Sequence, residues 1–332
     1  MSQITNDPRL LHQIDAGAIG RKRGHSYESI LAAKLNSLEM PFFKTHPNSR
    51  YVEIGKPELI LLNKILNYLG WEYCSSIRAY CTGRLATAED GEKVVSIDGV
   101  PIKKSKSDIV IKLTSPDKNV RIIGISVKQC NHKTPTNAQV FFTTATAFYE
   151  LAVNNGFALS ENALIAMKQF CGDPEYRPLD REDCTMRTSN PDRYFWEEIN
   201  AEGKSEWEGL FSNHQKDITK LLLQKGYPED PFPPEIILHK TKKSNIDNEE
   251  IAIFSMDEFI TLSCKYSNFE LCQYRVKKGR YKEPAGVEHL APRFGIIQMQ
   301  RGGQKQHPTQ LQFNLKAGYF YHPPFSDEIE IP

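Results

Sequence analysis

Three polar residues between positions 107 and 129 have types and a spacing that suit chemistry on a phosphate. Asp108 is followed by seventeen residues and then by Ser126, Val127 and Lys128. A carboxylate can hold a hard divalent cation, and such a metal can polarise a phosphate and lower the pKa of a bound water. A nearby lysine can orient that water or stabilise the charge that develops on the phosphorane. The alternative is a cross-strand ion pair with no chemistry, because polar residues are common at strand ends.

The elements that must position these residues are two β-rich runs on either side of the turn signal SPDKN at 115–119. In an antiparallel hairpin with its turn centred at Asp117, paired positions sum to 234, which places Asp108 opposite Ser126 and makes Lys128 its diagonal neighbour. Because side chains alternate along a strand, one face of the hairpin carries only apolar residues and is expected to be buried. These are Ile109, Ile111, Leu113, Ile123, Ile125 and Val127. A longer, asymmetric turn would shift this register by one or two residues.

Helical periodicity is visible in three other segments. HSYESILAAKLNSL at 25–38 predicts a helix with Ser26 as its N-cap. Its expected apolar stripe consists of Tyr27, Ile30, Leu31, Leu35 and Leu38. KPELILLNKILNYLG at 56–70 predicts a second helix, with Pro57 near its start and Gly70 at its end. NAQVFFTTATAFYELAVNNG at 137–156 predicts a third helix.

The remaining strand signals complete an α/β fold. A hairpin is expected at 93–102 around Asp98 and Gly99, with further strands at 233–240 and 249–256. FGIIQMQ at 294–300 and TQLQFNLK at 309–316 predict a C-terminal β-hairpin. The sequence therefore predicts an α/β fold with a C-terminal β-hairpin region.

The C-terminal hairpin has a polar face that suits the reading of base edges. Leu311, Phe313 and Leu315 alternate with Gln310, Gln312 and Asn314. Asn, Gln and Arg can contact base edges bidentately, and a two-stranded ribbon fits the major groove. The candidate DNA contacts here are Arg301, Gln304, Lys305, Gln310, Gln312 and Asn314. An ordinary amphipathic hairpin with a solvated face is the alternative.

Composition narrows the possible functions. The 332 residues are 39% hydrophobic and 25% charged, with no apolar run near the length of a membrane span and no secretory signal. The seven cysteines form no CxxC pair and no disulfide framework, so reduced thiols in a cytoplasmic protein are expected. No Gly-rich phosphate loop or GxSxG elbow is present, which argues against an NTPase or a serine hydrolase.

The net charge of +1 hides an uneven distribution. Residues 101–133 contain eight Lys and Arg against two acids, and residues 271–316 contain nine against two, whereas residues 161–230 contain fifteen acids against nine bases. Such a chain can present a basic cleft to nucleic acid, although solvated faces explain the same counts.

Asp108 followed by Ser126-Val127-Lys128 resembles the motif of the PD-(D/E)XK nuclease superfamily, in which the acid opens one strand and an acid-x-lysine ends the next. Glu28 in RGHSYESILAAKL resembles the glutamate that this family often carries in a preceding helix; an exposed helix glutamate is the alternative. The segment QCNHKTPTNAQ at 129–139 and the C-terminal hairpin resemble type II restriction endonucleases, particularly the CCGG-cutting kind. Ser126 departs from the usual acid and removes one metal ligand, and the literal Pro116-Asp117 lies in the turn, away from Lys128.

The resemblance implies a restriction-endonuclease-like fold, with a mixed central β-sheet flanked by helices. It also implies a Mg²⁺-dependent endonuclease that cuts double-stranded DNA at a short specific sequence. It implies catalytic roles for Asp108, Ser126, Lys128 and Glu28, and metal ligation by Asp108, Glu28 and the Val127 carbonyl. Further DNA contacts are expected at Lys106, Gln129, Asn131, His132, Lys133, Asn137 and Gln139.

The resemblance also suggests an organisation of the chain. Residues 1–160 would form the catalytic core, residues 161–234 an acidic and mostly helical insertion or linker, and residues 235–332 a DNA-recognition region packed on the core. A palindromic target would favour a homodimer, and a cognate DNA methyltransferase would be a partner of the system without physical contact. Two alternatives stay open: a repair or recombination nuclease of the same fold, and a catalytically inactive DNA-binding module.

Overall fold

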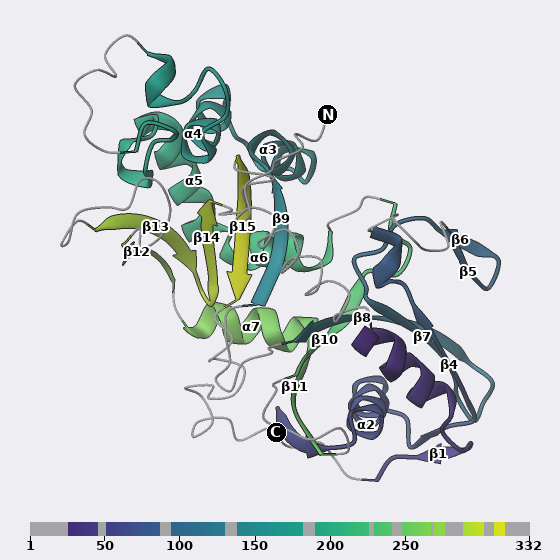
Figure 1. The fold of residues 1–332 in the computed structure, drawn as a ribbon. Helices are drawn as coiled ribbons and strands as arrows, with labels where there is room; N and C mark the ends of the chain where they lie inside the picture. Colours follow the sequence, from purple (N-terminus) through teal and green to yellow (C-terminus); the bar gives the residue numbers. More distant parts are fainter. Residues whose placement is uncertain are drawn as a thin grey trace, which may run out of the picture. The chain divides into compact units, whose positions relative to one another are not determined.

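A computed structural model describes most of the chain. The described residues are 26–45, 51–86, 94–129, 138–181, 190–225, 229–240, 248–266, 268–275, 288–301 and 309–315. Within these ranges no helix is both long and apolar enough to cross a membrane. The chain divides into two compact units (Figure 1). The first unit comprises Met1–Ala138, Lys220–Ile260 and Lys316–Pro332, and the second comprises Gln139–Thr219 and Thr261–Leu315.

The first unit is built on a six-stranded sheet with the order β2-β11-β10-β8-β7-β4. Strands β8 and β10 run parallel and the other neighbours run antiparallel, so the sheet is mixed as expected. Its strands are β2 (Val52–Gly55), β4 (Ser76–Cys81), β7 (Ile109–Thr114), β8 (Val120–Gln129), β10 (Pro234–Lys240) and β11 (Glu249–Ser255). Strands β1 (Phe42–Phe43) and β3 (Tyr73–Cys74) form a separate antiparallel pair.

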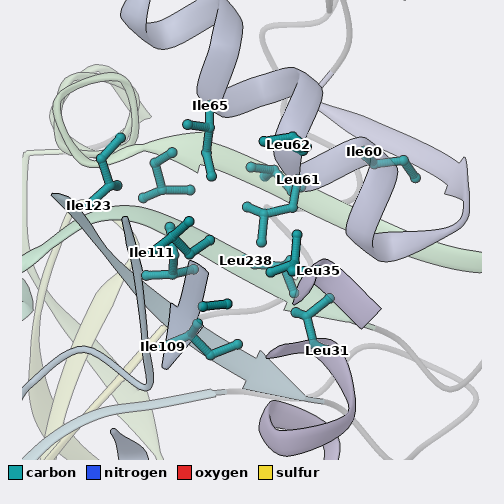
Figure 2. Close-up of a cluster of buried hydrophobic side chains, with 14 of the residues drawn as sticks. Leu31, Leu35, Ile60, Leu61, Leu62, Ile65, Ile109, Ile111, Ile123 and Leu238 are labelled. Carbon is teal, nitrogen blue, oxygen red and sulfur yellow. The ribbon is translucent and has the colours of Figure 1, made fainter. Parts of the chain in front are cut away.

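Two helices cover one face of this sheet. The first spans residues 26–36, and the second is α2 (Pro57–Leu69), which ends at Gly70 in the left-handed conformation that glycine adopts without strain. Figure 2 shows their apolar side chains meeting those of the sheet. The labelled members are Leu31, Leu35, Ile60, Leu61, Leu62, Ile65, Ile109, Ile111, Ile123 and Leu238. Each fully buried Leu or Ile stabilises the fold by about 1.5–3 kcal/mol, so this cluster is the main apolar core of the unit.

A smaller apolar cluster covers the other face of the sheet. Val110 of β7 packs with Ile97 and Ile102, which come from the hairpin β5 (Val95–Ile97) and β6 (Val100–Ile102). The hairpin predicted around Asp98 and Gly99 is confirmed, and both residues have positive φ angles, as a type I′ turn requires. The short 3₁₀ helix η1 (Gly83–Ala86) contributes Leu85 to the same cluster.

The second unit combines a five-stranded sheet, in the order β12-β13-β14-β15-β9, with helices of the acidic region. Its strands are β9 (Ala138–Thr144), β12 (Phe269–Tyr274), β13 (His289–Phe294), β14 (Ile297–Arg301) and β15 (Gln310–Leu315). Its α-helices are α3 (Ala145–Asn154), α4 (Glu161–Cys171) and α5 (Ala201–Asn213), with the 3₁₀ helices η2 (Pro178–Asp180) and η4 (Trp196–Glu198). Two helices, α6 (Gln215–Gln224) and α7 (Met256–Tyr266), each cross a boundary between the two units.

Aromatic side chains form the core of the second unit. The ring of Phe148 in α3 stacks on Trp207 of α5 at 4.9 Å and lies 4.8 Å from Phe313 of β15. Phe211 stacks on Phe294 of β13 at 4.8 Å. These rings join the helices to the sheet, so the C-terminal hairpin is part of the same core as the acidic region.

The structure differs from the sequence predictions for two helical segments. The segment 137–156 was expected to be one helix, but residues 138–144 form β9 and only Ala145–Asn154 is helical. The aromatic and β-branched run VFFTT suits a strand, and Thr144 then caps α3 by accepting a hydrogen bond from the Ala147 amide at 3.1 Å. Ile30 does not belong to the buried stripe of the first helix, because its side chain is 50% exposed while Ala32 is buried.

The two units also follow different bounds from the three expected regions. Strands β10 and β11 lie in the sheet of the first unit, although both were expected in the C-terminal recognition region. The sheet that carries Asp108 and Lys128 is therefore completed by residues more than a hundred positions further along the chain.

Candidate active site

The β7–β8 hairpin has the predicted register. Ile109 pairs with Ile125 and Thr114 pairs with Val120, so paired positions sum to 234. The six apolar residues at odd positions all lie in the main core. Asp108 therefore lies at the open end of the hairpin, opposite Ser126 and beside Lys128.

The Asp108 carboxylate is held through one of its two oxygens. The Val127 backbone N–H donates to Oδ2 at 2.6 Å, the Ser126 hydroxyl donates to it at 3.4 Å, and the Lys128 Nζ lies 3.6 Å from it. Among the residues that the structure describes, none donates a hydrogen bond or forms an ion pair with Oδ1. The Asp108 side chain as a whole is 22% exposed.

The backbone of Asp108 is fixed from both sides. Its carbonyl accepts hydrogen bonds from the amides of Thr82 and Gly83, both at 3.0 Å, and its own amide donates to the Ile125 carbonyl at 2.8 Å. These bonds hold the residue in place just before the start of β7, so its carboxylate has a defined position.

Glu28 is buried beside Asp108. Its side chain is 7% exposed, which rules out the exposed helix glutamate considered above. A Cβ atom built on Gly83 would clash with Glu28 Oε2 and lie 3.1 Å from Glu28 Cδ and 3.6 Å from Asp108 Cα. The Glu28 carboxyl group thus contacts Gly83, the residue whose amide binds the Asp108 carbonyl.

Lys106 lies near Asp108 and Lys128 and therefore belongs to the candidate active site. Its backbone N–H donates to Asp230 Oδ2 at 2.6 Å, and Asp230 also accepts from the Ser105 hydroxyl. The pKa of the Lys106 ammonium is lowered to about 7, mainly by burial and also by the charge of Lys128, while Asp108 opposes the decrease. Two lysines therefore lie within electrostatic range of one aspartate. In the sequence, Lys106 lies only two residues before Asp108.

Ser126 and Gln129 occupy the remaining predicted positions of β8. Ser126 is 4% exposed, and its hydroxyl makes the long hydrogen bond to Asp108. Gln129 is half-buried at the end of the strand, paired with Lys240 of β10. The Val127 side chain lies in the core, and its amide is the strongest anchor of Asp108.

His239 is a buried neighbour of Lys128 that sequence reasoning missed. The two residues pair across the parallel strands β8 and β10, and His239 is fully buried. Burial, together with the positive charge of Lys128, lowers the pKa of His239 to about 4. The imidazole is therefore neutral at physiological pH, which avoids a second positive charge against Lys128.

This shift predicts a pH dependence of stability. Since the folded pKa lies below the unfolded value of about 6.5, only the unfolded state takes up this proton between those two values, and stability falls as the pH falls through that window. His239→Gln should remove up to about 3 kcal/mol of the loss in unfolding free energy between pH 7 and pH 4. Urea denaturation at both pH values measures the free energy of unfolding of each protein. His214→Gln is the matched control, because His214 is exposed. An equal acid-induced loss in wild type and His239→Gln would contradict the prediction.

The second unit carries the predicted polar face of the C-terminal hairpin. Strands β14 and β15 pair antiparallel, with Gln300 opposite Gln312 and Gln298 opposite Asn314, while Leu311, Phe313 and Leu315 are fully buried. Gln312 Nε2 donates to Gln139 Oε1 at 3.3 Å and to Asn314 Oδ1 at 3.1 Å. Asn314 is only 4% exposed, so it supports Gln312, whereas Gln139 is exposed and Gln310 half-buried.

Arg301 lies apart from this amide face. It pairs with the buried Leu311 and therefore belongs to the opposite side of the hairpin. Burial lowers the pKa of its guanidinium to about 10, with nearby Arg193 adding to the decrease. The prediction that Arg301 joins the glutamines on one surface is thus not met.

Six predicted DNA contacts lie outside the described residues: Asn131, His132, Lys133, Asn137, Gln304 and Lys305. Their roles stay predictions. Within the described ranges, no group of three or more His, Cys, Asp or Glu side chains could hold a metal ion. From the described residues, a metal at this site would therefore draw one or two carboxylates, with backbone, water or substrate oxygens as further ligands.

The comparisons with known proteins add little to this geometry. A scan against protein-family models finds no match, and neither does a search of curated proteins. Among solved structures, the chain is similar to a crystal structure of the restriction endonuclease MspI in complex with its cognate DNA. That similarity has a TM-score of 0.42 and 11% sequence identity, and it covers 77% of this chain and 78% of the other. A likeness at this level establishes neither the family nor the activity of this chain.

Proposed function

We propose that this protein is a magnesium-dependent endonuclease that hydrolyses phosphodiester bonds of double-stranded DNA at a short specific sequence, as type II restriction enzymes do. The main support is the arrangement of the Asp108 carboxylate. One oxygen is bound by Val127 N–H and lies near Lys128, the side chain is partly exposed, and the buried carboxyl group of Glu28 contacts Gly83, whose amide binds the Asp108 carbonyl.

The residues at this position fit a magnesium ion. The donors are two carboxylates, Asp108 and Glu28, with the Val127 carbonyl as a third candidate, and oxygen donors are what Mg²⁺ prefers. Mg²⁺ commonly binds through one or two carboxylates and keeps several waters, which suits a site without a three-carboxylate cluster. When bound, the ion would polarise the scissile phosphate and make a bound water more acidic.

The two lysines and the serine of the site have separate roles in this proposal. Lys128, 3.6 Å from Asp108, orients the attacking water or stabilises the charge that develops on the phosphorane. Lys106 contacts a non-bridging phosphate oxygen from the loop that precedes Asp108. Ser126 occupies the position of a usual acid and acts by donating a hydrogen bond to Asp108.

DNA sequence would be read by the second unit. Gln312, with Gln139 and Asn314 orienting its amide, and Gln310 beside it are the candidate base contacts of the described hairpin. A homodimer on a palindromic site and a cognate DNA methyltransferase as the system partner complete the proposal.

The first test is cleavage of unmethylated phage DNA in magnesium by wild type and Lys128→Ala. Discrete fragments should appear with wild type and be lost or slowed at least a hundredfold, roughly the effect of losing one charge-stabilising group, in the variant. Lys112→Ala is the matched control, because Lys112 lies on the neighbouring strand and pairs with Asp98 at the surface. It should cut like wild type.

Other outcomes identify the alternatives. DNA binding without cleavage in several divalent metals would favour the inactive binding module. Nicks, or cuts that follow DNA structure instead of sequence, would favour a repair or recombination nuclease. If the protein neither binds nor cleaves DNA, the Asp108–Lys128 contact would be a structural ion pair without a catalytic role.

A further inference from the structure

A buried polar cluster joins the start of the first helix to the end of the sheet. The Glu249 carboxylate of β11, only 3% exposed, accepts a hydrogen bond from the Tyr27 hydroxyl at 2.7 Å and from the Lys240 ammonium at 2.8 Å. The Lys240 ammonium also lies 4.3 Å from the centre of the Tyr27 ring. Each member thus contacts the other two, in a place where an unpaired charge would be costly.

The cluster adjoins the candidate active site through the chain itself. Tyr27 precedes Glu28, and Lys240 follows His239, which pairs with Lys128. Lys240 itself pairs with Gln129 at the end of β8. The cluster therefore links the segments that carry Glu28 and Lys128.

Glu28 needs such support because of its position in the helix. It lies in the first turn of the helix at 26–36, where the backbone N–H groups have no intrahelical acceptor and helices fray. A carboxylate that binds a metal must keep its direction. Anchoring Tyr27 to Glu249 sets the rotation of this turn, and the contact with Gly83 limits the Glu28 carboxyl group from the other side.

We propose that Tyr27, Glu249 and Lys240 are positioning residues that aim the Glu28 carboxylate at a metal bound by Asp108. This inference rests on the proposed function, because it requires a divalent metal at that place. It adds a support layer of the kind that metal ligands in proteins commonly have. A purely structural role would lower stability and leave the affinity for metal unchanged.

The test uses Tyr27→Phe, which removes only the hydroxyl. Mn²⁺ binding to the full-length protein is measured by isothermal titration calorimetry, and cleavage is measured as a function of magnesium concentration. We expect the Mn²⁺ dissociation constant and the magnesium concentration at half-maximal rate to rise about tenfold, with the rate at saturating magnesium largely kept. Tyr68→Phe is the matched control, because the Tyr68 hydroxyl also donates to a glutamate, Glu235, at the surface.

Glu28→Gln separates this inference from the proposed function. If Tyr27 acts through Glu28, the double variant Tyr27→Phe/Glu28→Gln should bind Mn²⁺ no more weakly than Glu28→Gln alone. Glu249→Gln keeps the side-chain volume and an acceptor for the Tyr27 hydroxyl, so it should weaken Mn²⁺ binding less than Tyr27→Phe does. It replaces Tyr27→Phe in the test if that variant folds poorly. Wild-type metal affinity in Tyr27→Phe, with Glu28→Gln impaired, would overturn the inference and leave the proposed function standing. Absence of Mn²⁺ binding and cleavage in wild type would overturn both.

Discussion

Asp108→Asn is expected to slow DNA cleavage at least about a thousandfold, because several kcal/mol of metal-dependent stabilisation are lost. The amide is neutral and holds a divalent cation far more weakly than the carboxylate. Its side-chain oxygen can still accept the hydrogen bond from the Val127 N–H, so the hairpin should keep its structure. Single-turnover cleavage in magnesium, with the melting temperature measured in parallel, gives the result.

Asp98→Asn provides the comparison for this variant. Asp98 also pairs with a lysine, Lys112, but at the surface of the small hairpin β5–β6. It should cleave at the wild-type rate. The DNA affinity of Asp108→Asn without metal should equal or exceed that of wild type, since a negative charge is removed near a phosphate. A cleavage rate within tenfold of wild type would show that Asp108 holds no catalytic metal.

Gly124→Ala is expected to destabilise the first unit by about 1–3 kcal/mol and to impair cleavage as well. A Cβ at Gly124 would lie 2.6 Å from the carbonyl oxygens of both Phe232 and Pro233, and it would also clash with the Ser107 hydroxyl. A hydroxyl can rotate away, but the two carbonyls belong to the backbone, so the chain itself has to move. Because Ser107 directly precedes Asp108 and its hydroxyl donates to the Phe232 carbonyl, this movement reaches the active site.

Urea denaturation and cleavage well below the melting temperature measure the two effects separately. Gly55→Ala is the control from the same sheet, because its Cβ would meet only the Ile60 side chain, at 3.4 Å. It should change the free energy of unfolding by no more than about 0.5 kcal/mol. If Gly124→Ala were as stable and active as Gly55→Ala, the 229–233 segment would not be packed tightly against β8.

The β7–β8 hairpin could be predicted in detail because its information is local. A turn signal at 115–119 and alternating side chains on both sides allow one register, and a shift by one residue would expose six apolar side chains. The C-terminal hairpin was predictable for the same reason, and its buried Leu311, Phe313 and Leu315 confirm it. Arg301 was misplaced because it continues β14 and pairs with Leu311, which puts it on the side of the hairpin opposite the glutamines.

The boundary between β9 and α3 shows where local reasoning failed. The run from 138 to 154 is rich in apolar residues and suits either element by composition. Its first part became a strand because β15 offers an edge for pairing, and such a partner cannot be seen in the segment itself.

By itself, the sequence determined the hairpin, the face on which Asp108 and Lys128 meet, and the oxygen-donor chemistry that this pair can support. Only the tertiary structure decided that Glu28 is buried against Gly83, that Lys106 and His239 lie within the field of Lys128, and that Tyr27 is anchored to Glu249. The physical reason is the separation along the chain over which each kind of interaction acts. Turn chemistry and strand alternation act over a few neighbouring residues, whereas burial and charge act between segments that the fold brings together, here from residue 27 to residue 249.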